Sequence, residues 1–106
     1  TYARFNLSVA MYHTQDYEGA IREFEQVQKV LPWRTLWYQT EPIEAYFALG
    51  DYENVFALTD AVLNNHNRAF SELYVLRGKS YEKLGDHEAA QAEFEKARLY
   101  NIHLTL

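Results

Sequence analysis

The sequence predicts an all-α fold made of three consecutive helix-turn-helix hairpins. The first observation is a short motif that recurs at residues 15, 50 and 85, a spacing of 35 residues, as Gln15-Asp16-Tyr17-Glu18, Gly50-Asp51-Tyr52-Glu53 and Gly85-Asp86-His87-Glu88. The second is that each copy lies between two segments whose apolar residues recur at helical intervals. A recurrence of this length indicates a repeat protein in which each unit is one pair of helices.

Each motif is predicted to form the turn of its hairpin. Gly50 and Gly85 can adopt the left-handed conformation that ends a helix, whereas Gln15 does so less well because it carries a side chain. The Asp that follows is a favourable N-cap for the second helix, since its carboxylate accepts hydrogen bonds from unpaired backbone N–H groups. The Glu two residues later is favoured at the positive end of the helix dipole.

The predicted core comes from one face of each helix. In the first helices, Ser8 and Gly78 are small enough for the paired helix to approach closely, and larger core residues follow one turn later at Met11, Tyr46 and Tyr81. In the second helices the inward face comprises Ala20, Phe24, Val27, Val55, Thr59, Val62, Ala90, Phe94 and Ala97. These aromatic residues are interpreted as core residues.

The middle hairpin is irregular. It has Ile43 at the small position and Thr59 where the other copies have Phe, an exchange that roughly conserves volume. Pro42 lacks an N–H donor and disfavours a helical conformation at the preceding residue. We therefore expect a short helix that begins after Thr40 with Pro42 in its first turn, and a separate helical turn over Trp33 to Gln39.

The three copies resemble the tetratricopeptide repeat, whose pattern is W-x2-L-G-x2-Y, then A-x3-F, then P. The third copy matches it at Gly78, Tyr81, Ala90, Phe94 and Ala97, with Tyr74 in place of Trp, Arg77 in place of Leu and Ile102 where Pro is usual. The first copy has Leu7, Ser8, Met11, Ala20, Phe24 and Pro32 in the expected order. The resemblance implies repeats at about residues 1–34, 36–69 and 71–104, which form a single domain over residues 1–106. It also implies a short right-handed superhelical solenoid that acts as a non-catalytic interaction scaffold.

In that family the first helix of each repeat lines a concave groove. The resemblance places these residues in the groove: Tyr2, Phe5, Val9, Tyr12, His13, Trp37, Thr40, Glu44, Phe47, Val75, Lys79, Glu82 and Lys83. The aromatic residues and the lysine pair suit a peptide with apolar anchors and an acidic group. Two alternatives stay open. Tyr2, Phe5 and Val9 are also explained as the uncovered end of the stack, and the lysines are also explained as ion-pair partners of glutamates on their own helix.

A second likeness concerns the middle of the chain. Leu31-Pro32-Trp33-Arg34, Leu36 to Gln39, Pro42 and Tyr46-Phe47 are similar to repeats appended to bacterial cysteine peptidases of the double-glycine leader type. This likeness implies a fragment of a longer chain, and it supports an alternative function as a structural spacer or accessory region with no ligand of its own.

The composition disfavours several classes of function. A net charge of −5 and a pI near 5.3 disfavour nucleic acid as a partner, and no apolar run is long enough to cross a membrane. There are no cysteines, and the four histidines are scattered without ligand spacing, so no metal, cofactor or catalytic residue is expected. The expected partner is a protein or peptide, with self-association possible through the apolar ends. The compartment stays undecided.

Overall fold

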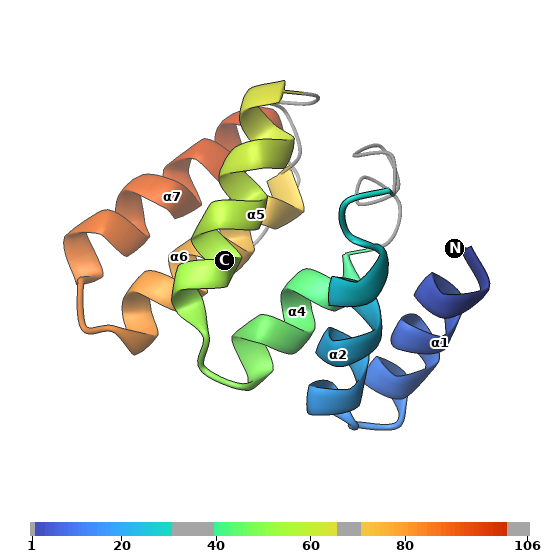
Figure 1. The fold of residues 1–106 in the computed structure, drawn as a ribbon. Coiled ribbons are helices and arrows are strands. Elements are labelled where there is room, and N and C mark those ends of the chain that lie inside the picture. Colours follow the sequence, from blue (N-terminus) through green and yellow to red (C-terminus); the bar gives the residue numbers. More distant parts are fainter. Residues whose placement is uncertain (1, 31–39, 66–70, 102–106) are drawn as a thin grey trace.

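The computed structural model describes residues 2–30, 40–65 and 71–101, and within these ranges it contains helices and turns but no strand. The helices are α1 (Tyr2–His13), α2 (Tyr17–Val27), α4 (Glu41–Ala48), α5 (Tyr52–Asn65), α6 (Ser71–Lys83) and α7 (His87–Tyr100). They form three hairpins that follow one another along the chain, α1 with α2, α4 with α5 and α6 with α7 (Figure 1). The predicted all-α solenoid of helical hairpins is confirmed.

The three turns share one backbone geometry. In each, the residue before the Asp has a positive φ, which is 67° at Gln15, 78° at Gly50 and 84° at Gly85. The amide of the following Asp then donates to the carbonyl five residues earlier, at 2.8, 2.9 and 3.0 Å in chain order. This pattern ends a helix with its last carbonyls satisfied. The turns predicted near residues 15, 50 and 85 are therefore confirmed.

The N-caps are also confirmed. The Oδ1 atom of each turn Asp accepts from the backbone N–H three residues later, at 3.0 Å for Asp16, 3.3 Å for Asp51 and 3.1 Å for Asp86. Each bond satisfies one of the N–H groups that a helix start leaves unpaired.

Small residues bring the helices of the first and third hairpins together, as predicted. Ser8 is fully buried, and its hydroxyl donates to the carbonyl of Ala20 at 2.6 Å. Gly78 lies so close to Phe94 that a Cβ atom placed on it would be 2.5 Å from Cε1 of the ring. Neither position has room for a larger side chain without movement of the partner helix.

The first helix of the middle hairpin begins where the position of Pro42 led us to expect. Thr40 is the N-cap of α4, and Pro42 lies in its first turn. With 8 residues, α4 is shorter than the 13-residue α6. Ile43 and Thr59 are both fully buried, and the Thr59 hydroxyl donates to the carbonyl of Val55 at 2.7 Å. The helical turn predicted over residues 33–39 lies outside the described residues.

Arg77 joins the second hairpin to the third. Its Nη1 atom lies 2.7 Å from Oδ1 of Asp60 and 2.9 Å from Oγ1 of Thr59, both on α5. Its Nε atom lies 3.3 Å from Oε2 of Glu93 on α7, a residue that is only 6% exposed. The guanidinium also lies over the Phe56 ring, 5.3 Å from its centroid. Arg77, which replaces the Leu of the repeat pattern, thus connects the second repeat to the third.

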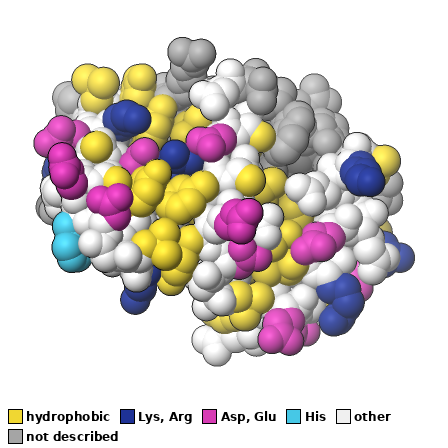
Figure 2. Space-filling view, turned by 60° about the vertical axis from the view of Figure 1, so that its left-hand side comes forward, with side chains coloured by type: hydrophobic (Ala, Val, Ile, Leu, Met, Phe, Trp, Pro, Cys, Tyr) yellow, Lys and Arg dark blue, Asp and Glu magenta, His cyan; other side chains and the backbone are white. Residues whose placement is uncertain are grey.

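Some large apolar side chains stay exposed. Leu99 is 71% exposed and Val30 is 66% exposed. On the face drawn in Figure 2, hydrophobic side chains gather near the middle with acidic side chains on both sides. Such surfaces can associate, and the self-association expected from the sequence stays a prediction.

Candidate functional site

The first helices of the three hairpins adjoin one another. Helix α4 contacts α1 on one side and α6 on the other (Figure 1). The first helices of successive hairpins therefore lie next to one another, as in a stack of repeats.

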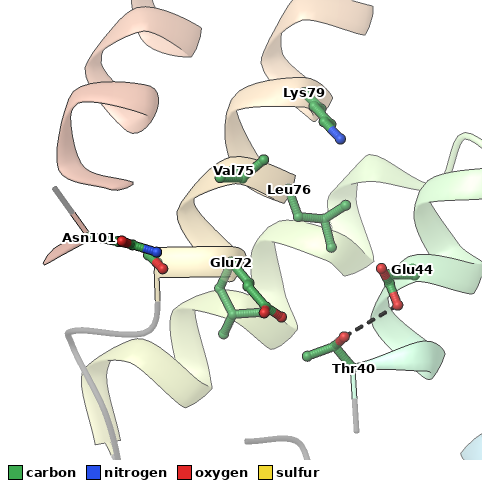
Figure 3. Close-up of a pocket in the computed structure, with 9 residues that line it drawn as sticks. Thr40, Glu44, Glu72, Val75, Leu76, Lys79 and Asn101 are labelled. Carbon is green, nitrogen blue, oxygen red and sulfur yellow. Dashed lines mark hydrogen bonds between the residues drawn. The ribbon is translucent and has the colours of Figure 1, made fainter. Parts of the chain in front are cut away.

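A cavity of about 310 Å³ opens between α4 and α6, next to the end of α7. Val75 and Leu76 form an apolar stretch along α6, with Glu72 one turn before them and Lys79 one turn after (Figure 3). Thr40 and Glu44 face this stretch from α4. The cavity thus combines an apolar floor with charged groups on two helices, the composition expected of a site that binds an amphipathic ligand.

Glu44 is a carboxylate without a cationic partner in the described part of the chain. Its Oε2 atom accepts from the Thr40 hydroxyl at 3.2 Å. Burial raises the pKa of the Glu44 carboxyl, and the neighbouring charges of Glu41 and Glu72 raise it further, while the Thr40 hydrogen bond and His13 act in the opposite direction. The local field is therefore unfavourable to the negative charge that Glu44 carries at neutral pH.

Glu41 extends this acidic region toward α1. Its Oε2 atom lies 3.3 Å from Nε2 of His13, so the pair spans the first and second hairpins. Its Oε1 atom is buried without a hydrogen-bond partner among the described residues. Burial raises the pKa of the nearby Tyr12 hydroxyl, and Glu44 is the largest charge that adds to the rise.

Two family models described as the tetratricopeptide repeat match this chain, one over residues 2–32 and one over residues 71–97. The chain belongs to the tetratricopeptide-repeat family. The two matches are the first and third repeats, and the irregular second repeat, with Ile43 and Thr59 at pattern positions, lies between them. Comparison with curated proteins and with solved structures gives no match. Tetratricopeptide repeats generally mediate protein–protein interactions, and the family is typically non-enzymatic.

Among the predicted groove residues, four line the cavity of this tetratricopeptide domain: Thr40, Glu44, Val75 and Lys79. Val9 and Phe47 are only partly buried and pack against the core, and the Phe47 ring lies 5.8 Å from that of Tyr52. Lys83 is exposed on α6 outside the cavity lining.

The structure corrects the prediction that Phe5 lies in the groove, and two other predicted groove residues, Tyr2 and Trp37, have side chains outside the described part of the chain. Phe5 is 1% exposed and its ring centroid lies 6.3 Å from that of Phe24, so it belongs to the core between α1 and α2 rather than to the groove surface. Its position three residues before the buried Ser8 places both on one helical face, a signal that the sequence already contained. Trp37 lies outside the described residues, as does the side chain of Tyr2, although Tyr2 begins α1.

Glu41, Glu72 and Leu76 belong to the site but were not among the predicted groove residues. Glu72 occupies the same place in its repeat as Trp37, 35 residues earlier, so the repeat spacing could have identified it. Glu41 enters the site because α4 begins at that residue, which the proline signal predicted without indicating which way the side chain points.

Residues 2–30, 40–65 and 71–101 contain no group of three or more His, Cys, Asp or Glu side chains arranged to hold a metal ion. No helix in these ranges is long and apolar enough to cross a membrane.

Proposed function

We propose that this tetratricopeptide domain is a non-catalytic protein-interaction scaffold, and that it binds an extended segment of a partner protein in the groove formed by α1, α4 and α6. The observation that carries the proposal is the cavity between α4 and α6, because it opens onto the partly buried Val75 and the edge of the largely buried Leu76, beside charged side chains from two consecutive repeats.

The physical role of each part follows from its chemistry. Apolar contact with the partly exposed Val75 would supply much of the affinity, since burial of apolar surface is the main favourable contribution at such sites, whereas Leu76 is already largely buried and only completes the floor. Polar groups such as Thr40 and Glu44 would orient the bound segment, because a mispaired or unpaired polar group in the interface is costly.

A structural spacer, or an accessory region of a larger bacterial peptidase, is the second candidate. The exposed Val30 and Leu99 favour it, because adjoining repeats or domains could cover apolar side chains at these places. The likeness of the second repeat to peptidase-appended repeats favours it too. A spacer, however, does not need an open cavity between its first helices.

Quantitative pull-down from the source cell tests the proposal when it compares three matched baits. Val75→Ser shortens the apolar floor, and Gln91→Ala changes an exposed residue of α7 that is not part of the cavity. We expect a true partner to be retained equally by the wild type and by Gln91→Ala, and about fivefold less by Val75→Ser, because part of a Val side chain is worth about 1 kcal/mol. Circular dichroism confirms that each bait is folded. Equal retention by all three baits would favour the spacer.

A further inference from the structure

We infer that the segment bound in this groove carries a basic side chain, Lys or Arg, whose aliphatic stem lies on Val75 and Leu76 and whose charged end lies between Glu44 and Glu72. This inference rests on the proposed function and names the chemistry of its partner.

The shape of the cavity suits such a side chain. Its volume of about 310 Å³ is at the small end of ligand pockets, so it fits one long side chain and its neighbours. Lys and Arg place an apolar stem on apolar surface while their charged end reaches polar groups. Here the apolar stretch of Val75 and Leu76 continues directly into the carboxylate of Glu72, with Glu44 opposite (Figure 3).

The charge of the cavity also favours a basic side chain. Within the described ranges, neither Glu44 nor Glu72 has a Lys or Arg within ion-pair distance, and the only hydrogen bond of Glu44 comes from the neutral Thr40 hydroxyl. Glu41, on the first turn of α4 beside the cavity lining, adds a third carboxylate, which lies 3.3 Å from Nε2 of His13. A cation supplied by the partner would neutralise this field, and the overall charge of −5 would attract it from a distance.

Among the described residues that line the cavity, Lys79 alone has a cationic side chain, and it fixes where the ligand cation can lie. It is exposed and makes no ion pair with any described residue. Its charge disfavours a second cation nearby, so the basic group belongs at the opposite end, beside Glu72. The sequence suggested instead that an acidic group of the peptide binds at Lys79 and Lys83. That hypothesis predicts a preference for acidic over basic peptides, so one experiment distinguishes it from the present inference.

The test is an NMR titration of the ¹⁵N-labelled chain with three short capped alanine peptides that differ only in a central Arg, citrulline or Glu. Citrulline keeps the length and polarity of Arg but lacks its charge. We expect the Arg peptide to shift the amide signals of residues 40–44 and 71–79, and to bind about tenfold more tightly than the citrulline peptide. The double variant Glu44→Gln with Glu72→Gln should lose this preference, Lys79→Gln should increase it, and Glu95→Gln, an exposed change on α7, should leave it unaltered.

Three outcomes would overturn the basic-ligand inference. These are a preference for the Glu peptide, equal affinity for the Arg and citrulline peptides, and no cavity shifts from the Arg peptide at millimolar concentration. The first two would leave the proposed function standing, because the cavity would still bind a peptide. After the third, the retention of partners by Val75→Ser decides the proposed function separately.

Discussion

Gly78→Ala should destabilise the chain although alanine favours helix. A Cβ atom at Gly78 would lie 2.5, 2.7 and 2.9 Å from Cε1, Cδ1 and Cζ of Phe94, and the Phe94 side chain is itself buried at 8% exposure. In a helix interior Ala increases the free energy of unfolding by about 1 kcal/mol relative to Gly. A methyl group forced into a packed core decreases it by about 1 to 3 kcal/mol. Because three ring atoms are overlapped, we expect the upper end of that cost and a net loss of about 1 to 2 kcal/mol.

Thermal unfolding followed by far-ultraviolet circular dichroism measures this loss, which corresponds to a Tm lower by about 4 to 16 °C for a domain of this size. The double variant Gly78→Ala with Phe94→Leu should be more stable than the sum of the single changes predicts, since Leu makes room for the methyl group. Gln91→Ala, on the exposed face of α7, should stay within about 0.5 kcal/mol of the wild type. A Gly78→Ala variant as stable as the wild type would refute the reasoning.

Three further changes test the turns, the cavity and the bridge between repeats. Gln15→Gly should raise the free energy of urea unfolding by about 1 kcal/mol, because Gln15 has a φ of 67° that glycine adopts without strain, and no gain would contradict this. Glu44→Gln should stabilise the chain at neutral pH by less than about 1 kcal/mol after solvent screening, since the raised pKa of Glu44 means that its charged form costs stability. That advantage should shrink as the pH falls through the raised pKa toward the ordinary value, and an advantage that grows in acid would refute it. Arg77→Leu restores the family residue but leaves Glu93 buried without its Arg, so we expect a loss of about 3 kcal/mol in urea unfolding, partly recovered by adding Glu93→Gln; unchanged stability would count against the bridge.

The sequence predicted the features whose causes are local. The turns depend on a positive φ and an Asp N-cap within a few residues, and the repeat spacing presented that signal three times. The short α4 followed from Thr40 and Pro42, because proline restrains the residues next to it. The close contact at Gly78 was predictable for the same reason, since a repeat position that is small in two copies indicates packed helices.

Features that depend on several helices were harder to predict. Arg77 was visible as a departure from the pattern, but its role requires Asp60 and Glu93, which come from two other helices. Of the residues that the resemblance placed in the groove, Thr40, Glu44, Val75 and Lys79 line the cavity, and their role in binding stays a prediction. The resemblance could not show that the carboxylates there lack a cationic partner in the described ranges, because that depends on how side chains of α1, α4 and α6 point toward one another.

Photo-crosslinking from the cavity is the sharpest test of whether this domain binds a partner segment there. A photoreactive amino acid would replace Val75 in one variant and Gln91 in another, and mass spectrometry would identify the crosslinked peptides after irradiation in the source cell. We expect position 75 to give adducts to a specific segment of a partner protein. This segment should contain a Lys or Arg close to the crosslinked residue, and position 91 should not capture it. Adducts from position 91 alone, or the same proteins at equal yield from both positions, would show that the cavity is not the binding site.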